Sequence, residues 1–255
     1  MPAGTVQAAK FGDYEYSVNN DGTVTIKNYT GSATTLQIPS ILDGKNVIVI
    51  GESAFEDCIG LTSITIPNSV ATIGDYAFQD CEDLTSITIP NSVTTIGDGA
   101  FIGCNRLTSI TIPNGVTSIE DWTFLDCDRL TSITIPNSVT TIGNGAFWGC
   151  EGLTSITIPN SVTTIGKSAF SMCTKLKKIT IPAKVTSIGK EAFYGCKNLK
   201  NITIKTTKLT SKKIGSKAFK GIHAKATIKV PKKKLAAYKK ILKKKGVGSK
   251  AKIKS

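Results

Sequence analysis

The 255-residue chain has few of the side chains on which most catalytic and metal sites depend. It contains one histidine, His223, and it has no Ser/His/Asp grouping, no Gly-rich phosphate loop and no specially placed pair of carboxylates. These absences argue against acyl transfer, phosphoryl transfer and metal-assisted hydrolysis. We therefore expect no catalytic residue, no cofactor and no metal ion, and a protein that is not an enzyme.

Long apolar runs are absent too. A membrane-spanning helix needs roughly 20 consecutive apolar residues, and no stretch approaches that length, so no transmembrane segment is expected. The chain is nevertheless 40% hydrophobic, which is enough for a sizeable core. Residues 1–10 have the small-residue character of a signal-peptide cleavage region without the apolar run before it. We interpret them as a disordered leader or a signal-peptide remnant; a remnant would place the protein outside the cytoplasm.

Positive charge is concentrated at one end. Residues 1–174 carry 6 Lys or Arg and 17 Asp or Glu, a net charge of −11, whereas residues 175–255 carry 26 Lys, no Arg and one acid, Glu191, a net charge of +25. Lysine acts as a point charge, whereas bidentate recognition of phosphate or guanine favours arginine. The basic end therefore indicates contact with a diffuse polyanion, not specific nucleic-acid recognition.

What the sequence has in abundance is a repeat of 23 residues. The stretch Leu84–Cys104 returns almost unchanged 46 residues later as Leu130–Cys150, and six full units run from residue 61 to residue 198. A fixed period of this length predicts a solenoid, in which each coil buries its apolar face only against its neighbours.

The unit itself predicts the path of one coil. In the unit that starts at Leu84, Ile87 and Ile89 alternate with polar residues, which is typical of a half-buried strand. A second extended segment follows at 93–96, and Gly97 makes a bend. The apolar spacing within 100–104 fits about one helical turn that faces inward.

The pattern L-x-x-I-x-I-P-x-x-V-x-x-I-G-x-x-A-F-x-x-C covers residues 36–224 and includes seven phased copies of A/T-F-x-x-C. It resembles the BspA-like leucine-rich repeat, also called the TpLRR type. The resemblance implies a leucine-rich-repeat solenoid: a right-handed parallel β-solenoid of 23-residue coils with short helical or 3-10 turns. It also implies a secreted or cell-surface protein with a role in adhesion.

Four segments are expected along the chain. Residues 1–10 form the leader, 11–35 an N-terminal β-hairpin cap, 36–224 the solenoid of about eight coils, and 225–255 a Lys-rich C-terminal cap. Within the last segment, Pro231 and Gly246 bound a helix, with Leu235, Tyr238, Ile241 and Leu242 on its docking face.

Several columns of equivalent residues have alternative interpretations. The seven cysteines from Cys58 to Cys196 should point the same way from stacked coils, which disfavours disulfides and predicts small buried hydrophobes. The bend glycines provide either a positive φ or close packing. Glu120 replaces one of them, so either the requirement is not absolute or the coil at 107–129 is locally altered. The Asn column that includes Asn91 is either a buried ladder or a set of exposed turns.

The candidate binding residues lie where the repeats differ. Ile102, Leu125 and Trp148 follow the repeated Phe on three consecutive coils, Tyr194 belongs to the same column, and Trp122 lies nearby. If exposed, they form an apolar strip of the kind that marks a binding site. The alternative is that loops half-bury them, or that the variation is neutral drift between duplicated units.

A second candidate contact is electrostatic. Its residues are the lysines of the C-terminal cap: Lys232, Lys233, Lys234, Lys239, Lys240, Lys243, Lys244 and Lys245. They form a solvated cap with no partner, an anchor for anionic wall polymers, acidic glycans or membrane, or a nucleic-acid contact, for which interleaved aromatics are too few.

The leading hypothesis is a non-enzymatic cell-surface or secreted protein that binds a host or microbial surface protein or glycan. The first alternative is a structural or wall-associated scaffold attached through its Lys-rich end. The others are an ice- or lattice-binding protein that uses outward Ser and Thr, and a consensus repeat scaffold without a natural ligand.

Overall fold

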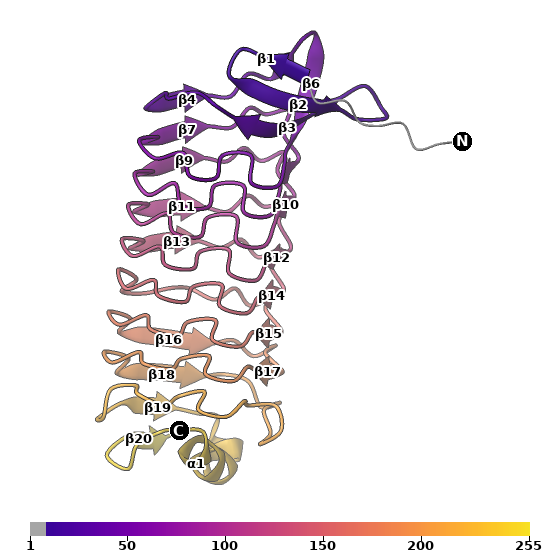
Figure 1. Cartoon of the computed structure of the whole chain (residues 1–255). Helices are drawn as coiled ribbons and strands as arrows, with labels where there is room; N and C mark the ends of the chain where they lie inside the picture. The colour runs from indigo at the N-terminus through magenta and orange to yellow at the C-terminus, as the bar shows by residue number, and fades with distance from the viewer. Residues whose placement is uncertain (1–8) are drawn as a thin grey trace.

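The computed structural model of the chain describes residues 9–255 and shows a column of stacked coils closed at both ends (Figure 1). The expected leucine-rich-repeat solenoid is therefore confirmed. Most of the expected leader, residues 1–8, lies outside the described residues. Its last two residues, Ala9 and Lys10, belong to a strand.

Each coil has three sides, which we name the strand face, the bend face and the turn face. The strand face consists of β4 (Thr35–Gln37), β7 (Ser63–Thr65), β9 (Ser86–Thr88), β11 (Ser109–Thr111), β13 (Ser132–Thr134), β16 (Lys178–Ile181), β18 (Asn201–Ile204), β19 (Thr227–Lys229) and β20 (Lys252–Lys254). The bend face consists of β6 (Lys45–Ile50), β8 (Thr72–Ile73), β10 (Thr95–Ile96), β12 (Ser118–Ile119), β14 (Thr141–Ile142), β15 (Thr164–Ile165) and β17 (Ser187–Ile188). Paired strands of the repeat are parallel, and in the regular units equivalent residues 23 apart pair, as Ser63 does with Ser86.

The turn face corrects one expectation. The segment at 97–104 is not a helical or 3-10 turn, because Gly99 and Gly103 are left-handed (φ 58° and 66°) and interrupt a helical path. The N–H groups of Gly99 and Gly103 instead donate to the Asp121 and Leu125 carbonyl oxygens of the next coil, at 2.8 and 2.9 Å. The turns therefore stack by hydrogen bonds between coils, as the strands do.

A ladder of aromatic rings fills the core behind the turn face. Each Phe from Phe55 to Phe219 is fully buried, and successive ring centroids lie 5.2–5.5 Å apart. Tyr29 and Tyr14 continue the ladder into the N-terminal cap. Stacked aromatic pairs are worth about 0.5–1.5 kcal/mol beyond the area they bury. The ladder therefore couples neighbouring coils and joins the cap to the solenoid.

The cysteines are buried hydrophobes as expected, except for the half-buried Cys58, and all seven are free. Their thiols add a bond that the sequence did not predict. The Cys104 thiol donates to the Phe78 carbonyl oxygen of the preceding coil at 3.2 Å, and the five other buried cysteines repeat this contact.

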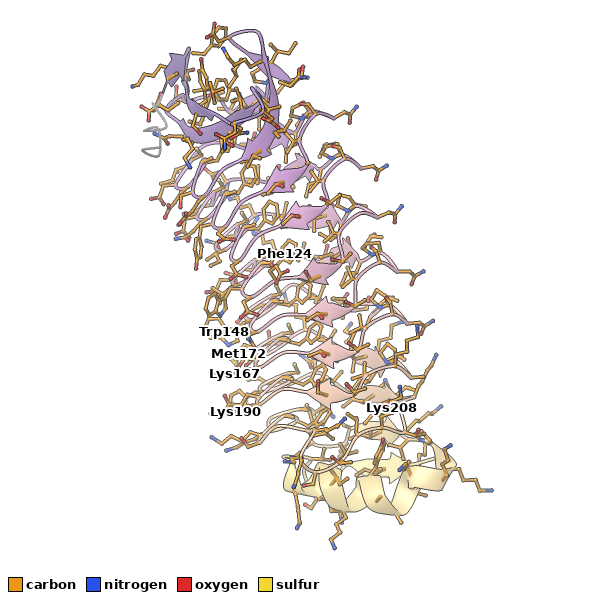
Figure 2. The ribbon with its side chains drawn as sticks, turned by 90° about the vertical axis from the view of Figure 1, so that its right-hand side faces the viewer. Phe124, Trp148, Lys167, Met172, Lys190 and Lys208 are labelled. Carbon is orange, nitrogen blue, oxygen red and sulfur yellow. The ribbon has the colours of Figure 1, made fainter. Side chains whose placement is uncertain are left out.

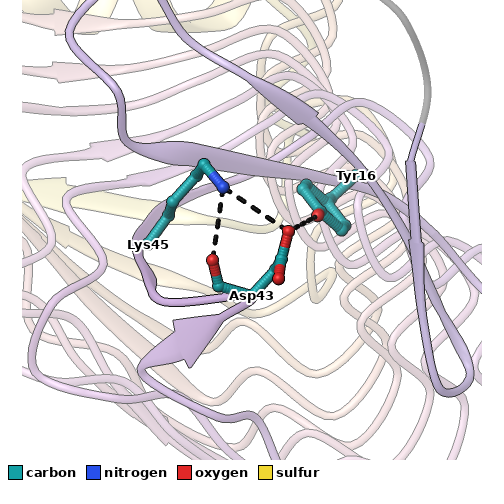
Figure 3. A network of polar contacts seen from close by, with 3 residues as sticks. All are labelled: Tyr16, Asp43 and Lys45. Carbon is teal, nitrogen blue, oxygen red and sulfur yellow. Dashed lines mark hydrogen bonds and ion pairs between the residues drawn. The ribbon is translucent and has the colours of Figure 1, made fainter.

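The N-terminal cap is the predicted hairpin with one more strand. β1 (Ala9–Phe11), β2 (Tyr14–Val18) and β3 (Val24–Tyr29) are antiparallel, and β3 pairs in parallel with β6 at the start of the stack. β5 (Ile41–Leu42) and β6 form a second hairpin, whose turn has positive φ at Asp43 and Gly44. The Asp43 carboxylate accepts a hydrogen bond from Tyr16 at 3.1 Å and pairs with Lys45 at 3.5 Å, which ties this hairpin to the cap (Figure 3).

The C-terminal end departs from the expected boundary at residue 224. β19 and β20 continue the strand face beyond it, so the last segment contributes coils as well as a cap. Between them lie a 3-10 turn (Lys232–Lys234) and α1 (Leu235–Lys244). The buried Tyr238 anchors α1, because its hydroxyl donates to the Thr206 carbonyl oxygen at 2.9 Å. No helix among residues 9–255 is long and apolar enough to cross a membrane.

Between coil 84–106 and coil 107–129 the stack is interrupted on two faces at once; the strand face has a second break, between β13 and β16. Within the described residues β9 does not pair with β11, and β10 does not pair with β12. The bend glycines explain this seam: they have no positive φ, and a Cβ at Gly143 would lie 2.6 Å from the Glu120 carbonyl carbon of the preceding coil. Glycine is therefore needed for close packing, and the Cβ of Glu120 separates the two coils. The coil at 107–129 is locally altered, which was one of the two alternatives.

A candidate aromatic binding site on the turn face

Two left-handed positions in each turn place the candidate residues. The first of them is occupied by Gly99, Trp122 and Gly145 in three successive coils, and Trp122 has φ of 55°. A bulky residue in this conformation is strained by about 1–3 kcal/mol. The chain thus keeps an indole at a position where the coils on either side have glycine.

The glycines on the following coils make room for the rings. A Cβ at Gly145 would lie 2.6 Å from Cδ1 of Trp122, so the indole lies directly over that glycine. The same arrangement occurs two coils earlier, where the Tyr76 ring lies over Gly99 beside the Ile102 side chain. Alternation of ring and glycine therefore lets large side chains lie flat along the stack.

The structure brings most of the predicted strip together. Leu125 and Trp148 occupy equivalent places on adjacent coils, and the Leu125 N–H donates to the Trp122 carbonyl oxygen at 2.9 Å within one turn. Ile102 lies on the coil before that of Leu125, and the turn faces of these two coils remain hydrogen-bonded to each other across the seam. Tyr194 is not part of the cluster, because the buried Ser171 occupies the same column between it and Trp148.

The two indoles border a shallow depression with a volume of about 340 Å³. It is lined by Trp122, Leu125, Asn144, Gly145, Trp148, Lys167 and Ser168. Trp122 and Trp148 are 42% and 38% exposed, among the few large apolar side chains that remain open to solvent. Figure 2 shows Trp148 on the same edge of the column as Lys167 and Lys190. The depression thus combines two aromatic surfaces with an amide, a hydroxyl and an ammonium group, which suits a ligand with both apolar and polar faces.

Polar side chains of successive coils form a ladder of hydrogen bonds beside the indoles. The Asp121 carboxylate accepts both the Asn144 backbone N–H at 2.6 Å and its side-chain amide at 2.8 Å, and Asn144 Oδ1 accepts the Lys167 backbone N–H at 2.8 Å. The ladder continues backwards to Asp98, whose pKa is raised by burial and by the neighbouring carboxylates of Asp121 and Asp75. Asn144 is thereby held in one orientation, whereas the Lys167 side chain is exposed to solvent.

Four residues that line this depression were not among the predicted site residues: Asn144, Gly145, Lys167 and Ser168. Their positions precede the repeated Phe, and the sequence does not show that the left-handed turn carries these positions to the same surface as the residues after it. The variation at these positions was the available signal, since the column of Asn144 and Lys167 has Asp98 and Asp121 in the two preceding units.

The predicted electrostatic lysines belong to the 3-10 turn, to α1 and to the residue after it, and α1 lies at the end of the column (Figure 1). Lys234 and Lys245 are half-buried, and the six others are exposed. Tyr238 and Leu242 are buried beneath them, with Leu235 and Ile241 packed against the same core. The expected docking face of the helix is therefore confirmed, while a partner for the lysines stays a prediction.

The thiols have no role in this surface. Burial raises the pKa of Cys127, Cys150 and Cys173 well above the usual range of a thiol, and that of Cys196 to about 12. These groups stay protonated and unreactive near neutral pH.

Comparison with known proteins identifies the repeat. Residues 24–154 and 119–244 match the family described as BspA type leucine rich repeat region, in 6 copies. No match to a curated protein reaches significance. The crystal structure of the leucine rich repeat protein from T. pallidum is similar with a TM-score of 0.63 and 25% identity, over 96% of this chain and 100% of that chain.

Two further solved structures have lower scores. A leucine-rich repeat protein from Eubacterium ventriosum has a TM-score of 0.53 and 27% identity, over 86% of this chain and 70% of that chain. A leucine rich cell surface protein from Faecalibacterium prausnitzii has a TM-score of 0.47 and 24% identity, over 96% and 99%, which is too low to bear on function.

Proposed function

Because the chain belongs to the BspA type leucine rich repeat family, we propose that it is a non-enzymatic, adhesin-like binding protein, secreted or displayed at a cell surface, whose contact site is the aromatic depression. Its ligand is a host or microbial surface protein or glycan. Proteins of this family are typically non-catalytic, and leucine-rich repeats are suited to binding because they present a long, rigid surface.

The observation that carries the proposal is the pair of indoles held open to solvent at the edge of one depression. Trp122 is both strained, with φ of 55°, and 42% exposed. Full burial of a Trp removes about 150–250 Å² of apolar surface from water, and at roughly 25 cal/mol per Å² the exposed part forgoes about 2 kcal/mol. A ligand that covers the indoles would recover that free energy, and Trp is enriched among residues that dominate binding.

The test uses residues that the chain itself carries at equivalent positions. Trp122→Gly copies Gly99 and Gly145, and Trp148→Ser copies Ser171, so both replacements suit the local backbone. The control is Ile59→Ser, which removes a 70% exposed apolar side chain from another coil. Each variant is measured for binding to immobilised matrix proteins and mucins, beside the wild-type chain.

We expect saturable binding that resists high salt, because covered apolar surface is not screened. Each Trp replacement should weaken it by roughly tenfold or more, while Ile59→Ser leaves it unchanged. Binding that all three variants retain, with melting temperatures near the wild type, would overturn the proposal.

A further inference from the structure

The strand face changes character towards the C-terminal end. Up to β13 its outward residues are Ser and Thr, apart from Gln37, but from β16 onward lysines enter the same columns. Strand pairing sets two columns side by side: Lys178, Asn201, Thr227 and Lys252 in one, and Thr180, Thr203, Lys229 and Lys254 in the other. Neighbours along a column are about 4.8 Å apart, and the two columns are roughly 6.7 Å apart.

These lysines have no acidic partner within residues 9–255. The one acid of the basic third, Glu191, pairs instead with Lys217 at 3.6 Å. Lys178, Lys229, Lys252 and Lys254 are all exposed, and so are Lys225 and Lys250 just before β19 and β20. The strand face therefore carries positive charge that no nearby carboxylate among the described residues neutralises.

The face is also hollowed along these columns. One depression of about 520 Å³ is lined by Lys178, Lys205 and the amides of Asn137, Asn160 and Asn201, together with hydroxyls of the Thr column. It arises where residues 155–158 form only a single bridge, Ser155 with Lys178, in place of a paired strand. A second depression of about 540 Å³ is lined by Lys225, Thr227, Lys250 and Lys252.

Register places the two depressions next to each other, because Asn201 of the first pairs directly with Thr227 of the second; we name the two together the trough. The trough runs along the axis of the column from the coil of Asn137 to β20. Five strand spacings separate those coils, which gives a length of roughly 24 Å. A ligand that fills it must be linear and must run across the strands.

The lining selects the chemistry of that ligand. Amides and hydroxyls on one half suit the hydroxyl groups of sugars, and the unpaired lysines on the other half require negative charge. Neither depression is lined by an arginine or an aromatic residue, the groups that would stack or read a nucleic-acid base. We propose that this trough binds a linear acidic polysaccharide along the strand face.

This site is separate from the aromatic depression and from α1. The depression lies on the turn face, and α1 closes the end of the column. The proposal does not depend on the aromatic site, so either can fail while the other stands.

The experiment compares two variants that lose the same number of positive charges. The trough variant combines Lys178→Ser and Lys252→Thr, at two lysines that line the depressions, with Lys229→Thr and Lys254→Thr, at two exposed lysines beside them on β19 and β20. The replacements are residue types already present in those columns. The matched control combines Lys239→Gln, Lys240→Gln, Lys243→Gln and Lys244→Gln on α1. Binding of a fluorescent heparin oligosaccharide is measured by anisotropy, with neutral dextran and inorganic polyphosphate as competitors.

We expect the trough variant to lose affinity by at least about tenfold, the α1 variant to stay near wild type, and dextran not to compete. Equal losses of heparin affinity in both variants would overturn the assignment of binding to the trough, since net charge alone would then explain binding. Polyphosphate that competes as well as unlabelled heparin at equal charge would overturn the sugar assignment.

A measurement on the unmodified chain covers the case in which the trough variant fails to fold. Lysine acetylation with and without heparin, followed by mass spectrometry, should show protection at Lys178, Lys229, Lys252 and Lys254. Protection confined to Lys239, Lys240, Lys243 and Lys244 would contradict the proposal.

Discussion

Replacing Glu120 with glycine should close the seam between coil 84–106 and coil 107–129. At each bend glycine from Gly51 to Gly215, the N–H donates to an Ile carbonyl oxygen of the preceding coil, at 2.7–2.9 Å. The corresponding bond from residue 120 to Ile96 is missing, and the adjacent pairing of β10 with β12 is missing with it. The Cβ of Glu120 accounts for both, because that position faces the backbone of the coil before it.

The expected gain in the free energy of unfolding follows from the backbone hydrogen bonds that Glu120→Gly restores. Each backbone hydrogen bond contributes about 0.5–1.5 kcal/mol net, and the bend and strand together regain roughly two. The greater freedom of glycine in the unfolded chain offsets about 0.5–1 kcal/mol. Glu120→Gly alone should therefore raise the free energy of unfolding by about 1 kcal/mol.

Gly115→Ser should add to this effect at the same seam. Ser92, Ser138 and Ser161 each donate a side-chain hydrogen bond to a Val carbonyl oxygen of the preceding coil, at 2.5–2.6 Å, whereas Gly115 has no hydroxyl to reach Val93. The double variant should gain roughly 2–3 kcal/mol. For a chain of this size, about 2–4 °C per kcal/mol corresponds to a melting temperature roughly 4–12 °C higher.

Calorimetry and amide hydrogen exchange together test the reasoning. The backbone amides at positions 117 and 120 should become protected in the double variant, because they gain partners in the preceding coil. In the reverse control, Gly143→Glu, the new side chain should separate coil 130–152 from coil 107–129 and lower the melting temperature. A double variant that melts no higher, with unchanged exchange at 117 and 120, would refute the idea that the Cβ of Glu120 separates the coils.

Three further predictions concern the core and the ladders. Phe124→Ala should lower the free energy of unfolding by about 3–5 kcal/mol, measured by urea unfolding; an unchanged midpoint would show that the ladder does not couple the coils. Asp98→Asn should raise the melting temperature at neutral pH: the folded-state pKa of Asp98 is raised, so this carboxyl destabilises the fold as pH rises through that pKa. The gain in melting temperature should vanish in acid, where the Asp98 carboxyl is protonated. A gain that is independent of pH would contradict the raised pKa of Asp98. Ellman's reagent at neutral pH should label Cys58 at most, and all seven thiols after denaturation; rapid labelling of Cys127 in the native chain would contradict its burial.

The sequence was sufficient for the features that depend on period. The 23-residue spacing of Leu and Phe predicted the coil and the inward Ile positions, because a stack of identical units has few ways to bury such a pattern. The hairpin cap was predicted from two strand-like segments on either side of the turn at residues 19–22. The docking face of α1 was predicted separately, from the helical spacing of its apolar residues.

The left-handed backbone conformation of the turn could not be predicted from the sequence. Tyr76, Trp122 and Ser168 are left-handed at a position where Gly99 and Gly145 also occur, so no consistent glycine signal marks it. Bonds to the next coil hold these residues in place, and such contacts override local preference. The expected helical turn was wrong for this reason.

The C-terminal boundary was missed because the last coils lose the repeat. β19 and β20 share little with the consensus, and their pairing is set by the strand already beside them. The candidate site was predicted in part: the column of Ile102, Leu125 and Trp148 was visible in the sequence, but the contribution of Asn144 and Lys167 required the path of the turn.

The most direct test of the account is saturation binding of the wild-type chain, Trp122→Gly, Trp148→Ser and Ile59→Ser to the mucin or matrix protein that the wild type binds best. The account predicts that affinity falls in both Trp variants, survives in Ile59→Ser and is little affected by salt. Affinity that is equal in all four chains, or that disappears for all of them at high salt, would contradict recognition through the aromatic depression.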